Sequence, residues 1–220
     1  MKRFKKLVFF LVVLTTFSLI FNILPKIANY FIKFENTNYD LNRDLKGQIK
    51  NNIPNYIDYE EIPEDFINTL ITVEDKRFFK HIGFDPIAMG RATLVNVKAR
   101  EYKQGGSTIT QQLAKNLFFT NEKSLGRKVK ELIVALAIED NYTKEDILEM
   151  YTNVIYYGEG AYGIEAASQK YFNKSARDMN FDEATLLAGS LKAPSIYNPF
   201  NTENAQQRHK VVLSIMQNIY

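Results

Sequence analysis

The sequence predicts a mostly α-helical protein that begins with one strongly apolar helix. Three observations predict it. Helix-capping residues recur along the chain from residue 63 onward. Runs of alternating polarity that are typical of β-strands are few. An apolar stretch without any charged residue occupies residues 7–24.

Composition and charge exclude several classes of protein. The chain has 220 residues, enough for one domain with an attachment, and no cysteine, which excludes disulfides, thiol catalysis and zinc–thiolate sites. Its two histidines, His81 and His209, are too few for a histidine-built metal site. The net charge is +3, and the extreme N-terminus alone supplies +4 through Lys2, Arg3, Lys5 and Lys6. The rest of the chain therefore lacks the basic surface of a nucleic-acid-binding domain.

The N-terminus is predicted to anchor the protein in a membrane. As a helix, residues 7–24 would span about 27 Å, close to the roughly 30 Å of a bilayer core. The cations of residues 1–6 predict a cytoplasmic tail, a single membrane pass and an external C-terminal domain. A cleaved signal peptide and a buried helix are the alternatives. Residues 25–60, of which 35–60 lack clear periodicity, are predicted to be a juxtamembrane stem.

The remaining residues, 61–220, are predicted to form the folded domain, and its helices are taken here in chain order. Pro63 begins a helix that runs through residue 75. Asp85 before Pro86 predicts a capped helix over residues 86–101. Thr108 with Gln111 forms a capping-box pattern ahead of a helix over residues 109–118.

The second half of the domain continues this pattern. Ser124 is predicted to cap a helix over residues 125–140, and Thr143 one over residues 144–156. Residues 156–167 form a glycine-punctuated turn that enters another helix. Asn180 with Glu183 predicts a capping box before a helix that Pro194 ends.

Two carboxylates stand at the end of the first helix of the domain. Glu74 and Asp75 are followed by two phenylalanines and by Arg77, Lys80 and His81. Aromatic surroundings raise the pKa of a carboxyl group, and nearby cations oppose that effect. Such a group is a candidate general acid or base. The alternative is a solvated acid at a helix end.

A polar segment, residues 105–116, follows the second helix. Its two glycines allow close approach to the main chain, and the N–H groups of the next helix point toward the loop, which suits an anion such as phosphate. Gln111 and Lys115 lie on one helix face, as do Gln112 and Lys115. The alternative is a capped surface helix after a flexible turn.

Two further segments are candidates for ligand binding. Five cations and one acid between residues 115 and 130 suit a polyanionic ligand, or else form a solvated helical face (Lys115, Lys123, Arg127, Lys128, Lys130 and Glu122). Tyrosines and an asparagine near glycines either line a sugar site or belong to the core (Tyr151, Asn153, Tyr156, Tyr157 and Tyr162).

Together these segments resemble the motifs of peptidoglycan glycosyltransferases, the transglycosylase domains of glycosyltransferase family 51. The pattern E-D-x-x-F-x-x-H-x-G is matched from Glu74 to Gly83, and G-x-S-T-I-T-Q-Q-x-x-K-N from Gly105 to Asn116. RKVKEL, KEDILEMYTNVIYYGEGAYGIEAAS and RHKVVLSIM follow in the family's order, although His209 replaces an expected basic residue. The resemblance covers residues 60 to 220. It implies an all-α, lysozyme-like fold with a large lobe, a small mobile lobe and a cleft between them.

The resemblance implies polymerisation of lipid II, a disaccharide-pentapeptide on undecaprenyl pyrophosphate. The 4-hydroxyl of an incoming lipid II attacks C1 of the lipid-linked glycan. The new β-1,4 linkage forms with inversion, and undecaprenyl pyrophosphate leaves. Membrane association and contacts with other cell-wall synthesis proteins are expected, on the outer face of a bacterial cell membrane.

The resemblance also implies roles for individual residues. Glu74 matches the family's base. Glu131 matches its second glutamate, which either orients the cations or binds a divalent cation such as Mg²⁺ or Mn²⁺. The residues that match pyrophosphate- and sugar-binding positions are Ser107, Thr108, Gln111, Gln112, Lys115, Asn116, Arg127 and Lys130. The secondary candidates are Asp75, His81, Arg91 and Lys123.

Two other functions remain open at the level of the sequence. A glycan-cleaving enzyme would use a glutamate acid, but it has no need for a pyrophosphate-sized cationic pocket. A membrane-anchored scaffold would bind lipid II without needing Glu74 and Glu131. No serine-x-x-lysine motif occurs, so no penicillin-binding transpeptidase is expected, and we expect a monofunctional enzyme rather than a truncated bifunctional one.

Overall fold

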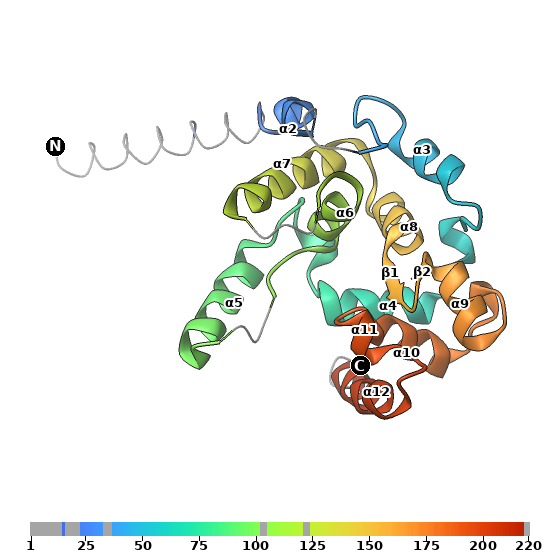
Figure 1. Ribbon diagram of the computed structural model, residues 1–220. Helices are drawn as coiled ribbons and strands as arrows, with labels where there is room; N and C mark the ends of the chain where they lie inside the picture. Colours follow the sequence, from blue (N-terminus) through green and yellow to red (C-terminus); the bar gives the residue numbers. More distant parts are fainter. Residues whose placement is uncertain (1–14, 16–22, 33–36, 102–104, 121–123, 218–220) are drawn as a thin grey trace.

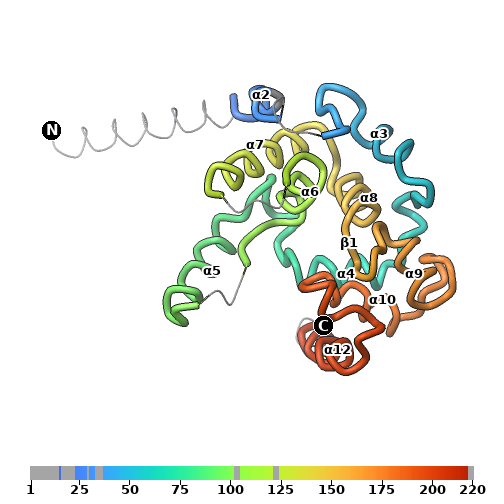
Figure 2. The backbone as a smooth tube through the Cα atoms, in the orientation of Figure 1, coloured from blue at the N-terminus to red at the C-terminus, as the bar shows by residue number. Residues whose placement is uncertain are grey.

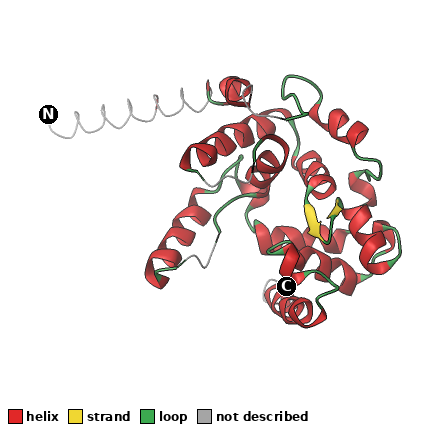
Figure 3. Cartoon of the chain, in the orientation of Figure 1, coloured by secondary structure: helices red, strands yellow, loops and turns green. Residues whose placement is uncertain are grey.

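The fold is almost entirely helical, and the predicted all-α class is confirmed (Figures 1 and 3). The computed structural model describes residues 15, 23–32, 37–101, 105–120 and 124–217. The predicted membrane anchor over residues 7–24 lies outside the described residues except for Thr15, Ile23 and Leu24. Among the helices that are described, none combines the length and the apolar character that crossing a bilayer requires.

The helices differ in length, and the longest belong to the predicted catalytic region. The α-helices are α2 (Ala28–Ile32), α3 (Leu45–Asn52), α4 (Glu64–Glu74), α5 (Pro86–Ala99), α6 (Ile109–Phe118), α7 (Leu125–Asn141), α8 (Lys144–Val154), α9 (Ile164–Phe172), α10 (Phe181–Ser190), α11 (Pro194–Tyr197) and α12 (Thr202–Gln217). Short 3-10 helices are η1 (Pro25–Ile27), η2 (Tyr59–Glu61), η3 (Phe78–Lys80) and η4 (Ala176–Asp178).

Side-chain caps explain where several helices begin. Thr108 and Gln111 form the predicted capping box of α6, and Asn180 and Glu183 form that of α10. Thr143 caps α8 and Ser124 caps α7 through side-chain hydrogen bonds to backbone N–H groups. These helix starts are therefore confirmed, because a cap is a local interaction that the sequence itself displays.

The predicted glycine turn is a small β-hairpin. Strand β1 (Tyr156–Gly158) pairs antiparallel with β2 (Ala161–Tyr162). Gly163 then enters α9 with φ of +82°, and a Cβ there would lie 2.7 Å from the carbonyl oxygen of Asn153. Only glycine fits this close approach at a positive φ.

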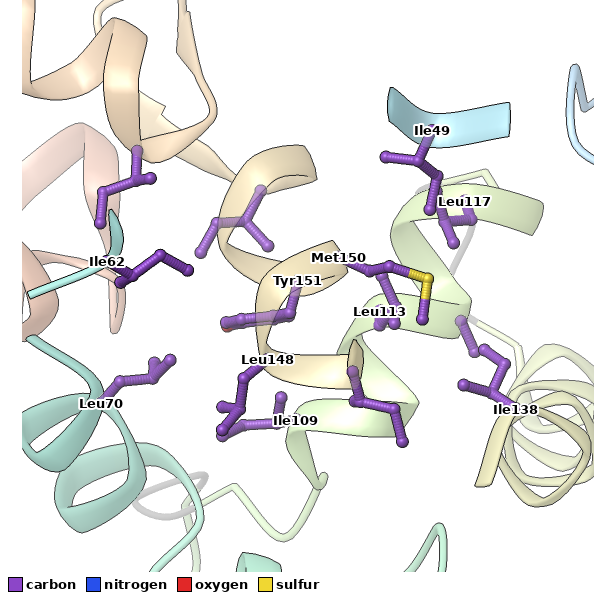
Figure 4. Close-up of a cluster of buried hydrophobic side chains, with 14 of the residues drawn as sticks. Ile49, Ile62, Leu70, Ile109, Leu113, Leu117, Ile138, Leu148, Met150 and Tyr151 are labelled. Atoms are coloured by element: carbon purple, nitrogen blue, oxygen red, sulfur yellow. The ribbon is translucent and has the colours of Figure 1, made fainter. Parts of the chain in front are cut away.

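Two groups of helices surround one hydrophobic core (Figures 1 and 2). In one group α10 packs against α4 and α12, and α11 packs against α12. In the other group α6 packs against α7 and α8. Figure 4 shows the buried cluster around α6 and α8, where Leu113, Leu148, Met150 and Tyr151 meet.

The prediction that residues 25–60 form a juxtamembrane stem is wrong for the part of this segment that the structure describes. Leu45 and Ile49 of α3 have no exposed surface, and Ala28 of α2 is equally buried. Helix α3 packs against α8, while η1 and α2 pack against α7. Residues 25–32 and 37–60 are therefore part of the folded body, because their apolar side chains complete its core.

The C-terminal region also differs from the prediction. Helix α10 ends at Ser190, before the expected stop, and Pro194 begins the short helix α11. Proline at the first helical position is favourable, since its missing N–H has no partner there in any helix. Helix α12 was not predicted, and it packs against α4 and α10.

Candidate active site

A cleft of about 910 Å³ brings together residues from both groups of helices. The C-terminal end of α4, helix α5 and the loop at residues 105–108 contribute to its lining. Residues 192, 208 and 215 also line it. Nine of the predicted site residues line it: Glu74, Asp75, Arg91, Ser107, Thr108, Gln112, Lys115, Arg127 and Glu131. Both predicted catalytic glutamates therefore face one cavity.

Glu74 is the last residue of α4 and is partly exposed to the cleft. Its Oε2 accepts a hydrogen bond of 3.1 Å from Nε2 of Gln112. Oε1 of Gln112 accepts a bond of 2.9 Å from the hydroxyl of Tyr151. The carboxylate at the mouth of the cleft is thus connected to the core through one amide.

Asp75 holds the start of α6 rather than facing solvent. Its carboxylate accepts a bond of 3.0 Å from the backbone N–H of Ile109, and Nε2 of His81 lies 3.0 Å from both of its oxygens. Asp75 and His81 are both buried. Nδ1 of His81 is a buried atom without a hydrogen-bond partner in the described part of the chain. This pair fixes α6, and with it Gln112 and Lys115, relative to α4.

Glu131 organises the basic side of the cleft. It is buried, with 1% of its side chain exposed, and its two oxygens bind Arg127 and Lys128 separately. Nζ of Lys128 lies 2.9 Å from Glu131 and also donates to Oγ of Ser107 at 2.6 Å. Burial lowers the pKa of Lys128, and the positive charges of Arg127 and Lys115 lower it further. Such crowded cations favour an anion as ligand.

Asp85 places α5 beside the cleft. Its Oδ1 accepts bonds from the N–H groups of Ile87 and Ala88, so it caps α5, and its Oδ2 accepts from Nε of Arg77 at 2.9 Å. Burial alone would raise the pKa of Asp85, but these backbone bonds and the Arg77 guanidinium outweigh it and lower that pKa. The capped helix carries Arg91 into the cleft lining.

Gly106 lets the loop that precedes α6 approach α5. A Cβ on Gly106 would lie 3.1 Å from Cα of Met89 and 3.3 Å from Cβ of Ala92. Thr108 is then tied down, since its Oγ1 donates to the carbonyl oxygen of Gly83 at 2.7 Å. Gly106 therefore allows the loop to pack closely against α5. In this position of the loop, Ser107 lies within hydrogen-bonding distance of Lys128.

Several predicted binding residues do not line the cleft. Gln111 is buried, and its Oε1 accepts from the N–H of Thr108 in the capping box, so that atom serves the helix. His81 is buried against Asp75, and Asn116 and Lys130 lie outside the cleft lining. Lys123 lies outside the described residues.

The residues around the β-hairpin also belong elsewhere. Asn153 is buried and bonds to both backbone groups of Ile57, and Tyr157 lies in the core. None of the tyrosines and asparagine considered as a sugar site lines the cleft within the described residues. Tyr151, Asn153 and Tyr157 are buried, which supports the alternative that they belong to the core, whereas Tyr162 is exposed.

Five basic residues in the cleft were not predicted as site residues: Lys76, Arg77, Lys128, Lys192 and Arg208. Lys128 belongs to the recognised cation cluster, and Arg208 begins the final motif, so the sequence contains a signal for both. Nε of Arg208 donates to the carbonyl oxygen of Gly189 at 3.0 Å. Burial lowers the pKa of Arg208, and the negative charge of Glu74 opposes that shift.

The residues around Glu131 do not fit a resident divalent cation. Each of its carboxylate oxygens is engaged by a cationic side chain, and a metal ion there would compete with both. Among the described residues, no group of three or more carboxylate, histidine or cysteine side chains is placed to hold a metal. Mg²⁺ and Ca²⁺ sites in proteins are built from oxygen ligands. Here the two carboxylate oxygens of Glu131 are already bound to Arg127 and Lys128.

Comparison with known proteins shows the family to which the chain belongs. A transglycosylase family model matches residues 42–217. The chain is 49% identical over 179 residues to penicillin-binding protein 1A of Aquifex aeolicus, and 47% identical over 158 residues to penicillin-binding protein 1A of Vibrio cholerae. These matches cover 81% and 71% of this chain but 25% and 19% of those proteins.

A third relative gives the same result. Penicillin-binding protein 1F of Bacillus subtilis is 45% identical over 161 residues, which is 73% of this chain and 22% of that protein. The chain thus spans about a quarter or less of the length of these relatives. The family match begins at residue 42, which agrees with the packing of α3 into the domain and corrects the predicted boundary at residue 61. The chain belongs to the transglycosylase family, the family of peptidoglycan glycosyltransferases that its motifs resemble.

Proposed function

We propose that this protein polymerises lipid II into β-1,4-linked glycan strands. The 4-hydroxyl of the incoming lipid II attacks C1 of the lipid-linked glycan with inversion, and undecaprenyl pyrophosphate is the leaving group. The observation that carries the proposal is that Glu74 and the cations organised by Glu131 line the same cleft. A base for the hydroxyl and a positive pocket for a diphosphate are the two groups that this reaction needs.

Glu74 acts as the general base in this proposal. It stands at the cleft end of α4, and its partial exposure allows contact with a bound sugar hydroxyl. Gln112 donates a hydrogen bond of 3.1 Å to Oε2 of this carboxylate and so holds it in place at the cleft. The base removes the proton of the attacking 4-hydroxyl as the bond to C1 forms.

The departing pyrophosphate is stabilised by charge rather than by protonation. Lys115, Arg127 and Lys128 line the cleft beside Ser107, and preorganised cations of this kind stabilise negative charge that develops in a transition state. Glu131 orients Arg127 and Lys128 by accepting from both. This orienting role is preferred to binding of Mg²⁺ or Mn²⁺, because the oxygens of Glu131 already have cationic partners.

The substrate explains the predicted membrane anchor. A polyprenyl tail stays in the bilayer, so an enzyme fixed at the surface meets its substrate at high effective concentration. We propose a single membrane pass over residues 7–24, a cytoplasmic N-terminus over residues 1–6 and a catalytic domain on the outer face of a bacterial cell membrane. Lipid II and the lipid-linked glycan are the proposed partners, with other cell-wall synthesis proteins.

The test uses purified full-length protein with labelled lipid II in detergent or vesicles. Long glycan products support a polymerase, shortening of pre-made glycan supports a hydrolase, and binding without turnover supports a scaffold.

Glu74→Gln should reduce the rate of polymerisation by about 10²-fold or more while lipid II binding is retained. Glu64→Gln, at the exposed start of the same helix, is the matched control and should leave the rate unchanged. Normal turnover by Glu74→Gln would show that another group is the base.

A further inference from the structure

The side chain of Gln112 connects the cleft to the core. It lies on α6 and lines the cleft, with its Nε2 directed to Glu74 at 3.1 Å and its Oε1 to the hydroxyl of Tyr151 at 2.9 Å. Tyr151 belongs to α8, which packs against α6. Three residues from three helices thus form one chain of hydrogen bonds that ends at the proposed base.

The orientation of this amide follows from the chemistry of its partners. An ionised carboxylate only accepts hydrogen bonds, so Gln112 must present its NH₂ group to Glu74. Its carbonyl oxygen then faces the other way and needs a donor. The hydroxyl of Tyr151 is that donor, so Glu74 and Tyr151 together hold the amide in one orientation, and loss of the hydroxyl removes one of its two anchors.

We propose that Tyr151 is a positioning residue for glycosyl transfer, acting through Gln112 to hold the carboxylate of Glu74 in its productive orientation. The inference deepens the proposed function and rests on it, since it assumes that Glu74 is the base. Gln112 is correspondingly assigned to Glu74 rather than to the phosphate or sugar for which the motif suggested it. Precise placement of a catalytic group depends on supporting residues that are themselves fixed by packing.

The surroundings of Tyr151 suit this role. Only 1% of the residue is exposed, and Figure 4 shows its ring on α8 inside the buried cluster, where Leu148 and Ile109 are also drawn. The ring therefore has little freedom to move. Burial raises the pKa of Tyr151 well above its ordinary value, and the negative charge of Glu74 acts in the same direction. The hydroxyl accordingly keeps its proton and remains a donor.

Tyr157 provides a matched control within the same core. It is also fully buried, and its hydroxyl donates to the backbone carbonyl oxygen of Thr152 at 3.2 Å. Burial likewise raises its pKa. Replacing either tyrosine by phenylalanine removes one buried hydroxyl and one hydrogen bond. Only Tyr151 is connected by these bonds to the cleft.

The experiment measures lipid II polymerisation by full-length protein, with kcat and KM determined separately. Tyr151→Phe should lower kcat by about 10-fold with KM within about twofold of wild type, because the proton acceptor is misplaced while the anion pocket is intact. Tyr157→Phe should keep the wild-type kcat. Thermal unfolding midpoints of the two variants check that they lose similar stability.

A double-mutant cycle separates positioning from general core damage. Gln112→Ala, at a partly exposed position, should lower kcat as Tyr151→Phe does. When Tyr151→Phe is added to Gln112→Ala, kcat should fall by less than about twofold further, because the bridge is already broken. Because Gln112→Ala leaves the buried hydroxyl of Tyr151 without its acceptor, thermal unfolding midpoints are measured for both single variants and the double variant.

Three results would overturn the inference: wild-type kcat for Tyr151→Phe, wild-type kcat for Gln112→Ala, or full additivity of the two changes. Equal losses of kcat in Tyr151→Phe and Tyr157→Phe would assign the effect to the core. Failure of the wild-type protein to polymerise lipid II would instead refute the proposed function. The two failures are therefore distinguishable in the same set of assays.

Discussion

Glu131 is a buried carboxylate that binds two cationic side chains. Its carboxylate is buried and accepts from Arg127 and Lys128, which stand four and three residues before it on α7. Residues at these spacings share a helix face, whereas Lys130, the immediate neighbour of Glu131, points to a different one. A buried carboxylate with two cationic partners is satisfied, and removing one partner would be more costly than removing an exposed ion pair.

Comparison of Lys128 with Lys130 tests this geometry. Lys128→Ala should weaken inhibition of polymerisation by inorganic pyrophosphate by about 10-fold, because a charge-assisted bond to the anion is lost. Lys130 lies outside the cleft lining, so Lys130→Ala should change the inhibition by pyrophosphate by less than about twofold. The apparent inhibition constant of each variant, measured at one salt concentration, decides between them. The opposite ranking would support the assignment made from the motif.

Gln111 and Gln112 show how neighbours in one motif divide two tasks. Gln111 completes the capping box of α6, and Gln112, one position later on the helix, faces Glu74 and the cleft. The sequence predicted the capping role of Gln111 correctly, and it also predicted a ligand-binding role for the same side chain. The cap bond to the N–H of Thr108 uses the oxygen that would have been offered to a ligand.

At the scale of elements, the caps set the positions of the site helices. Asp85 begins α5, Thr108 begins α6 and Ser124 begins α7, so three side-chain caps fix where Arg91, Lys115 and Arg127 stand. These starts were predicted because capping depends on residues within one turn of each other. Helix α3 was missed, although Leu45 and Ile49 are spaced four apart, because the surrounding segment offered no clear periodicity.

Substitution of leucines tests whether α3 belongs to the folded domain. Leu45→Ala should lower the free energy of unfolding by about 2–5 kcal/mol, since it leaves a cavity at a fully buried position. Leu94→Ala on α5, where 63% of the residue is exposed, is the matched control and should change it by no more than about 0.5 kcal/mol. Chemical denaturation monitored by circular dichroism measures both. Equal stability of the two variants would restore the interpretation of residues 25–60 as a detached stem.

For the whole molecule, the cleft gathers positive charge that the overall composition does not reveal. Eight basic and four acidic side chains line it, a difference of +4, although the chain as a whole carries only +3, with +4 from its N-terminal tail. The remainder of the chain is therefore net negative. The positive charge of the cleft, on a chain that is otherwise net negative, attracts anions to the cleft.

Salt dependence tests this charge distribution. The KM for lipid II should rise as salt increases from about 0.01 M to about 1 M, where the screening length falls from roughly 30 Å to roughly 3 Å. A double variant, Lys76→Gln with Lys192→Gln, should show a weaker dependence because two cations of the cleft are removed. Lys98→Gln, at an exposed position of α5 outside the cleft lining, should behave as wild type. A KM that is independent of salt would contradict attraction by the cleft.

The sequence by itself determined the all-α class, the starts of the site helices and the family motifs, and the resemblance carried by those motifs implied that Glu74 and Glu131 act in one site. The helix starts could be predicted because capping depends on residues within one helical turn. Only the tertiary structure decided that Lys128 reaches Ser107, that Gln112 joins Glu74 to Tyr151, that Arg208 enters the cleft and that α3 belongs to the core. Each of these contacts joins residues that are far apart in sequence, and helix periodicity says which residues share a face but not what that face meets.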